Sequence, residues 1–259
     1  MIDNLMRDTG RPGDPREASS FRDPSGYLFW RNGKIYRCVL GKYEKQFAAA
    51  LDTGLFDQCV ADGLLLPFSI SDVPAPEPCL AVLEPRQLSF ISYPYEWCFE
   101  QLQDAALRTL DIHLAALEKG MLLKDASAYN IQFVDGRPLL IDHLSFDLVS
   151  DHGAWPAYGQ FCRHFLAPLA LMSYVDLGMI RLLQLHIDGI PLDLASQLLP
   201  RKTKWKFGLA THLHIHAKLS VKHAGARTSI KTKSLSAQQL SALAQSLKST
   251  IKSLSPVGK

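Results

Sequence analysis

The sequence predicts an α+β fold in which a small β-rich part is followed by a larger helical part. Three observations support this prediction: a turn dipeptide between β-prone runs near the start, a long helical periodicity in the middle, and strongly apolar helical segments beyond it. Strands first and helices later is typical of α+β proteins. The 259 residues are enough to bury a large core, in one large domain or two lobes.

The β-rich part begins with a hairpin. The runs 27–30 and 34–39 flank Asn32-Gly33, the residue pair that a type I′ turn prefers. The next segments are expected to be a helix with a break at Gly54, a connector around a weak strand, and two short strands: 43–63, 67–78, 79–83 and 88–91. An extended link, 92–97, then serves as the hinge before the helical part.

The helical part begins with a long amphipathic helix over 96–119. Its apolar residues recur at steps of three and four, and Gly120 stands where a helix C-cap is expected. Further helices are predicted at 157–174, 177–187, 191–199, 205–224 and 237–254. The last has an apolar stripe and follows a polar linker (227–233), so we expect it to be separate from the body and to bury its stripe against a partner or another domain.

Four segments are therefore expected: a disordered leader (1–20), a small β-rich lobe (21–92), a helical lobe (93–226), and a basic linker with a C-terminal helix (227–259). The leader lacks the apolar core of a signal peptide, and no apolar run approaches the length of a membrane span. The five cysteines are scattered and lack metal-ligand spacing, which favours a reducing cytoplasm over a disulfide framework.

Charge is divided sharply along the chain. Residues 201–259 carry 12 Lys/Arg and no Asp or Glu, which leaves 16 basic against 25 acidic side chains in the first 200 residues. The basic tail could meet an anionic partner (nucleic acid, a membrane surface or an acidic domain) or pack on its own acidic body. Aromatic residues among these charges are few, Trp205 and Phe207, so contact within or between domains is favoured, nucleic acid is not expected, and no membrane is expected as a partner.

The candidate site lies in residues 121–147. Asp125 and Asn130 stand five apart; β-prone runs flank the turn pair Asp135-Gly136, and the second run ends at Asp142. A hairpin brings its ends together, so Asn130 and Asp142 should lie side by side, with Asp125 in the loop before them. Such a hairpin also occurs in ordinary α+β domains without a metal, but the long helix before the loop favours the functional interpretation.

The chemistry that these oxygen-bearing side chains suggest is phosphoryl transfer. In protein-kinase-like sites the loop aspartate accepts the hydroxyl proton, and the asparagine and the second aspartate hold Mg²⁺ against the phosphates. Asp125 would then be the catalytic base, and Asn130 and Asp142 the metal ligands. His212, His214 and His216 also invite a metal interpretation, but no Cys, Asp or Glu stands nearby in the sequence, so core or surface histidines are expected.

Two resemblances extend this interpretation. The segments 123–130 and 140–142 are similar to the Asp-x4-Asn and Asp-x-x motifs of protein-kinase-like and aminoglycoside-phosphotransferase-like folds. The segments 90–97, 124–133 and 161–170 resemble the N-terminal region of bacterial proteins related to the nodulation protein NoeA, over about residues 24–224. In that family the region usually precedes a class I S-adenosylmethionine-dependent methyltransferase domain, whose glycine-rich fingerprint does not occur after Asp142.

The chain departs from the kinase pattern at several positions. Leu123 replaces the histidine before the catalytic aspartate, Asp142 is followed by His-Leu, and no G-x-G-x-x-G loop is present. Arg37 on the second strand is the expected stand-in for the phosphate-binding lysine, with Glu44 as its partner on the following helix.

The resemblance implies a two-lobed, kinase-like domain that binds Mg²⁺ and ATP and transfers phosphate to a hydroxyl of a small molecule or glycan. The alternative is a non-catalytic domain that docks a methyltransferase domain or subunit.

Overall fold

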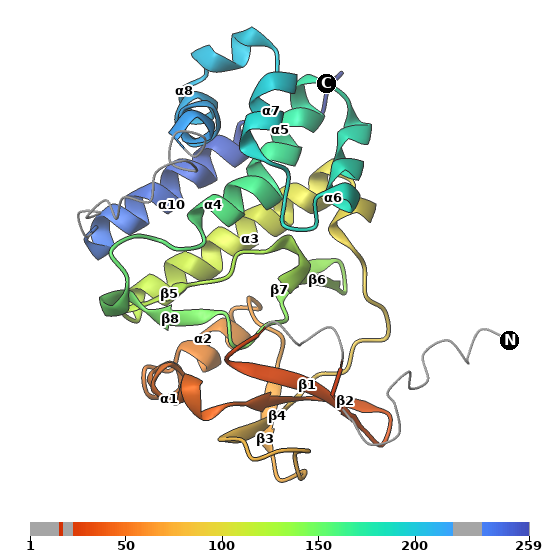
Figure 1. The fold of residues 1–259 in the computed structure, drawn as a ribbon, viewed down its shortest axis with the longest axis vertical. Helices are drawn as coiled ribbons and strands as arrows, with labels where there is room; N and C mark the ends of the chain where they lie inside the picture. Colours follow the sequence, from red (N-terminus) through yellow and green to blue (C-terminus); the bar gives the residue numbers. More distant parts are fainter. Residues whose placement is uncertain (1–15, 18–22, 220–234, 259) are drawn as a thin grey trace, which may run out of the picture.

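The computed structural model describes residues 16–17, 23–219 and 235–258. A small antiparallel sheet lies at one end of the molecule and the main group of helices at the other, which confirms the α+β class (Figure 1). The predicted leader, apart from Arg16 and Glu17, and the linker 227–233 lie outside the described residues. Within the described ranges, no helix is both long and apolar enough to cross a bilayer.

The small sheet has the strand order β1-β2-β4-β3: Gly26–Arg31, Lys34–Val39, Ala81–Pro85 and Phe68–Ser71. Asn32 and Gly33 both have positive φ (51° and 74°), which confirms the type I′ hairpin turn. The strand predicted at 88–91 is wrong, because those residues are irregular. Pro85 ends β4 without an N–H, and the side chain of Gln87 instead pairs with both the N–H and the carbonyl of Ile35 (2.9 and 3.0 Å).

Helices α1 (Glu44–Asp52) and α2 (Leu55–Ala61) follow the first hairpin and are separated at Gly54, whose φ is 68°, as predicted. The chain after α2 joins the helical part through its backbone. Leu66 N–H donates to the Leu140 carbonyl (2.8 Å), and Leu140 N–H donates to the Leu64 carbonyl (2.9 Å).

The long helix is confirmed as α3 (Phe99–Glu118), followed by Gly120 with φ of 71°. Strand β5 (Met121–Leu123) pairs with β8 (Phe146–Leu148), and between them β6 (Ile131–Val134) and β7 (Arg137–Leu140) form the predicted second hairpin. Asp135 and Gly136 at its turn have φ of 51° and 77°. The loop and hairpin thus lie against α3, on the side facing the small sheet (Figure 1).

The later helical segments lie close to their predicted bounds, but several are broken into turns of different helix type, and residues 220–224 of the helix predicted at 205–224 lie outside the described residues. Helix α4 (Tyr158–Phe161) continues through a π-helical turn (Cys162–Leu166) into α5 (Ala167–Tyr174). The segment predicted as helical at 177–187 is helical over 177–185, as a 3-10 turn (Leu177–Arg181) that leads into a short α6 (Leu182–Leu185), where Leu185 is exposed. Then come α7 (Leu192–Leu198), a 3-10 turn (Arg201–Trp205), α8 (Phe207–Leu209) and a π-helical turn (Ala210–Ile215).

Helix α10 (Ala237–Lys252) corrects the expectation of a separate C-terminal helix, because it packs along α3 (Figure 1). Leu240, Leu247 and Ile251 of its apolar stripe are buried in the main core. The Gln103 amide of α3 donates to the carbonyls of Ile251 and Leu254 (2.9 and 3.0 Å), and Lys248 forms an ion pair with Asp111 of α3. The apolar stripe of α10 is therefore buried against α3 of the same chain.

Candidate functional site

The second hairpin brings two of the predicted site residues to its open end. Ile131 pairs with Leu140, and beyond this pair the Ile141 N–H donates to the Asn130 carbonyl (2.8 Å). Asn130 and Asp142 therefore leave the hairpin next to each other. A 3-10 turn immediately before β6 positions Asn130, whose N–H donates to the Ser127 carbonyl (3.1 Å).

Asp125 lies in the loop that leads into this turn. Its Oδ1 accepts hydrogen bonds from the Ser127 N–H (3.0 Å) and from Nε2 of Gln160 on α4 (2.8 Å). The Gln160 side chain also accepts from the Ala126 N–H (2.8 Å), so one amide holds both the carboxylate and its loop. In the described part of the chain, Asp125 Oδ2 has no hydrogen bond.

Arg37 of β2 joins the small sheet to the hairpin end. Its Nη2 lies 2.8 Å from Asp142 Oδ1, and the same guanidinium forms an ion pair with Asp23. Arg37 is 9% exposed, so the pair is largely withdrawn from water. Glu44, its predicted partner, is exposed at the first position of α1, and the carboxylates that Arg37 contacts in the described residues are Asp23 and Asp142.

The surroundings of Asp142 favour its charged form. Burial alone would raise the pKa of this carboxyl group, but Arg37, the Ser145 hydroxyl and the Leu144 N–H (3.2 Å) together hold the pKa below its usual value. The neighbouring His143 is also buried, and burial lowers its pKa to about 4. His143 is therefore neutral at pH 7, and its Nε2–H donates to the Leu66 carbonyl (2.8 Å).

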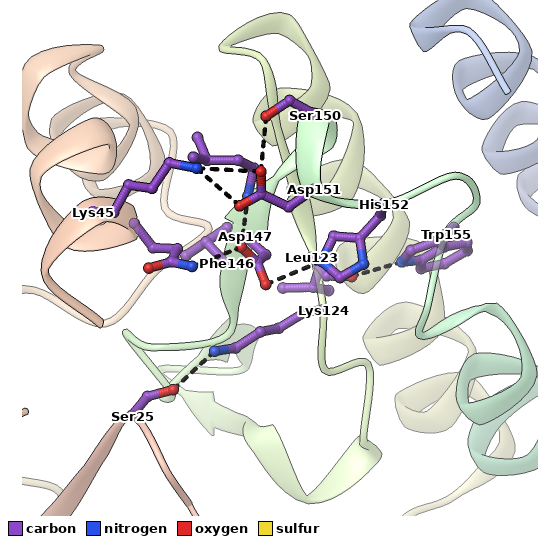
Figure 2. Close-up of polar contacts among 12 residues, drawn as sticks. Ser25, Lys45, Leu123, Lys124, Phe146, Asp147, Ser150, Asp151, His152 and Trp155 are labelled. Carbon is purple, nitrogen blue, oxygen red and sulfur yellow. Dashed lines mark hydrogen bonds and ion pairs between the residues drawn. The ribbon is translucent and has the colours of Figure 1, made fainter. Parts of the chain in front are cut away.

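Lys124 places a second cation close to the start of β1. Its N–H donates to the Ser145 carbonyl (2.7 Å), and its ammonium donates to the hydroxyl of Ser25 (2.9 Å), as Figure 2 shows. The same ammonium lies 4.4 Å from the centre of the Tyr43 ring. A Cβ added to Gly26 would lie 2.2 Å from the Cys38 carbonyl oxygen and 2.6 Å from the Leu144 side chain, so glycine allows β1 to lie this close to β2 and to the loop after Asp142.

A second polar junction lies beside the site and joins α1 to β8 (Figure 2). Asp147 accepts from Nε2 of Gln46 (3.1 Å) and from Nε2 of His152 (3.0 Å), and Lys45 lies 3.2 Å from Asp151. Burial would raise the pKa of Asp147, but these donors outweigh burial and lower it. Because its oxygens already have partners within the fold, this carboxylate connects the two parts of the molecule.

Four residues of the site were not predicted from the sequence: Asp23, Lys124, Ser145 and Gln160. Lys124 and Ser145 could have been found, because one adjoins Asp125 and the other follows Asp142 by three residues. Asp23 and Gln160 carry no such signal. They are distant in sequence, and only the fold brings them to Arg37 and Asp125.

The three histidines near the C-terminal side are packed in the helical part. His212 lies between the Tyr158 hydroxyl (2.9 Å) and the Ser246 hydroxyl (2.9 Å). His214 contacts Ser196 and Thr203, and the His216 ring stacks on Tyr158 at 4.9 Å. Burial lowers the pKa of all three. Their contacts are thus those of neutral histidines within a core, and among the residues described here no three His, Cys, Asp or Glu side chains gather as a metal site.

The fold and the site define an α+β protein in which a buried arginine of a small sheet meets an aspartate at the end of a hairpin. No family model matches the chain. It is 37% identical over 224 residues to the nodulation protein NoeA of Rhizobium meliloti (strain 1021), which shows that the two are related over that region. The alignment covers 83% of this chain and 45% of NoeA, so the chain spans less than half of that protein's length.

Proposed function

We propose that this chain is a kinase-like domain that binds a nucleotide with Mg²⁺ and transfers a phosphoryl group to a hydroxyl. The observation that carries the proposal is the ion pair between Arg37 of the small sheet and Asp142 at the hairpin end. Long helix, loop with Asp125, hairpin and Asp142 follow one another in the order used by kinase-like sites.

The donor chemistry fits the implied metal. Asn130 and Asp142 would hold the ion, and a carboxylate and an amide oxygen are hard donors of the kind that Mg²⁺ prefers. Asn130 stands next to Asp142 at the hairpin end, and its amide oxygen is the atom that would face the ion. When bound, Mg²⁺ would neutralise charge that develops on the phosphates.

The chain's own residues have distinct roles in this proposal. Asp125 has one oxygen fixed by Ser127 and Gln160 and the other without a hydrogen bond, so the second oxygen can accept a hydroxyl proton. Arg37 and Lys124 supply positive charge for phosphate oxygens, since Arg37 is a fixed cation and, among the described residues, the Lys124 ammonium contacts a hydroxyl and a ring but no carboxylate. Asp23 would leave Arg37 as the phosphates approach.

The cleanest test uses Asn130→Ala, because the Asn130 side chain has no hydrogen bond to another described residue, so the melting temperature should stay unchanged. Unmodified protein should be stabilised by ATP with Mg²⁺ by about 2.7 kcal/mol at a ligand concentration of 100 times the Kd. Asn130→Ala should lose this stabilisation and its phosphoryl transfer. The matched control is Asp135→Asn at the exposed hairpin turn, which should keep both. A protein that ATP and Mg²⁺ leave unstabilised would refute nucleotide binding.

A non-catalytic accessory domain of a methyltransferase system is the second candidate. It is favoured by the way protein groups already occupy both oxygens of Asp142 and one oxygen of Asp125. On this view the polar cluster only holds the small sheet against the hairpin. Asp142→Asn would then lower the melting temperature, because it leaves the buried Arg37 without half of its charge partners, and ATP would have no effect on either protein.

A further inference from the structure

The turn that joins α7 to α8 exposes an unusual combination of side chains. We call residues 201–207 the basic-aromatic turn; it contains Arg201, Lys202, Thr203, Lys204, Trp205, Lys206 and Phe207. Trp205 is 90% exposed and Phe207 is 80% exposed, although large aromatic side chains are normally buried. The helices that this turn joins lie at the end of the molecule opposite the small sheet (Figure 1).

The exposed residues of the turn flank a buried residue that anchors the turn to the body of the protein. Thr203, in the centre of the turn, is fully buried, and its hydroxyl donates to the Pro200 carbonyl (2.7 Å) and lies 2.9 Å from His214 Nε2. The chain is therefore anchored at its midpoint while the residues on both sides point outward. Residues three apart share one side of a 3-10 turn, which puts Lys202 beside Trp205.

The turn is strongly basic. None of its four cations has a carboxylate partner among the described residues, and the chain has no Asp or Glu after Asp193. Lys202 and Lys206 each place their ammonium group 5.9 Å from the centre of the Tyr174 ring. A cluster of basic side chains such as this turn attracts an anionic partner.

Exposed aliphatic side chains also occur on the segments next to the turn. Leu198, the last residue of α7, is 42% exposed, and Ile215, on the π-helical turn that packs against the basic-aromatic turn, is 52% exposed. A hollow of about 190 Å³ opens beside Lys206 and Phe207. Bases of a single-stranded nucleic acid stack on aromatic rings, but they gain little from leucine and isoleucine. The bilayer interface accepts both aromatic and aliphatic side chains, and anionic headgroups attract lysine and arginine.

We propose that the basic-aromatic turn docks the protein on an anionic lipid bilayer. Trp205 and Phe207 enter the headgroup region, and the four cations contact anionic headgroups. Each basic residue near such a surface strengthens binding about fivefold. The proposal differs from the sequence-based expectation of no membrane partner because the sequence did not reveal that both rings face solvent.

The test is co-sedimentation of the full chain with vesicles of phosphatidylcholine containing 30% phosphatidylserine, and with vesicles of pure phosphatidylcholine, at about 0.1 M salt. We expect binding to the anionic vesicles that weakens at about 0.5 M salt, and little binding to the neutral ones. The double variant Lys204→Gln/Phe207→Ala should bind at least tenfold more weakly. The matched control, Lys42→Gln/Phe90→Ala, removes an exposed lysine and a 70% exposed phenylalanine elsewhere and should bind like the unmodified protein.

Equal binding by both double variants would overturn the proposal, and so would equal binding to neutral and anionic vesicles. A single-stranded oligonucleotide that displaces the protein from vesicles at lower concentration than soluble phosphatidylserine headgroup would assign the surface to nucleic acid instead. Because both substituted side chains are exposed, unchanged circular dichroism and melting are expected for the variants. The readouts do not involve nucleotide, so they are independent of the proposed phosphoryl transfer.

Discussion

Replacing Leu247 by alanine tests whether α10 belongs to the core of this domain. Leu247 is 0% exposed in the main core cluster, within the surface that α10 shares with α3. The substitution keeps helix propensity, because alanine is the best helix former. Its whole effect should therefore come from lost burial and from the cavity left beside α3.

The expected loss is about 3 kcal/mol, within the range of about 2–5 kcal/mol for fully buried Leu→Ala changes. Unfolding entropy of about 2.1 cal/mol/K per residue gives roughly 0.5 kcal/mol/K for a chain of this length. The melting temperature should then fall by about 6 °C.

Thermal and urea unfolding, followed by circular dichroism at 222 nm, measure this change. The matched control is Gln245→Ala on the exposed face of the same helix, which should change the melting temperature by less than about 1 °C. If Leu247→Ala and Gln245→Ala have the same melting temperature, α10 is detached in solution and the packing of α10 on α3 is wrong. A deletion of 235–259 should likewise expose α3 and cause aggregation.

Two further predictions concern pH and a close backbone approach. Burial holds the pKa of His113 at about 3 and those of His143, His164 and His212 at about 4, below the ordinary 6.5. As the pH falls, these histidines therefore take up protons in the unfolded chain before they do so in the folded protein. The free energy of unfolding should be at its full value above about pH 6.5 and should fall as the pH drops towards 4. The slope should reach about 1.4 kcal/mol per pH unit for each histidine, and urea midpoints that stay level between pH 7 and 5 would contradict it. Gly26→Ala should lower the free energy of unfolding by more than about 2 kcal/mol, because its Cβ would lie 2.2 Å from the Cys38 carbonyl oxygen. The control Gly41→Ala, whose Cβ would have nothing within 4 Å, should change it little. Equal melting temperatures of the two variants would refute the close approach at Gly26.

The hairpins and the long helix could be predicted because their signals are local. Asn32-Gly33 and Asp135-Gly136 determine their turns by backbone preference, and the apolar period of α3 is read directly from the chain. The strand at 88–91 failed because the interruption at Pro85 and the Gln87 side chain outweighed β propensity. The placement of α10 failed because a stripe shows that a helix is buried but not against which surface.

The candidate site divides in the same way. The positions of Asn130 and Asp142 at one hairpin end follow from strand pairing, which sequence can predict. The partners of Arg37 could not be predicted, because Asp23 and Asp142 reach it through the packing of separate elements. The kinase pattern suggested Glu44 as the helix partner of Arg37, but helix α1 begins with that side chain facing solvent.

The backbone bonds between Leu64–Leu66 and Leu140 limit how the two parts of the molecule can move. They place residues 64–66 as a third segment along the edge of the second hairpin, and the His143 side chain contacts the Leu66 carbonyl beside them. A rotation of the small sheet about residues 92–97 would have to carry this edge along or break both bonds. Asp142 directly precedes His143, so it stays with this edge of the second hairpin. Any closure of the small sheet over the site would have to bend the strands of the sheet and α1 towards the hairpin, while the chain after α2 stays bonded to the hairpin edge.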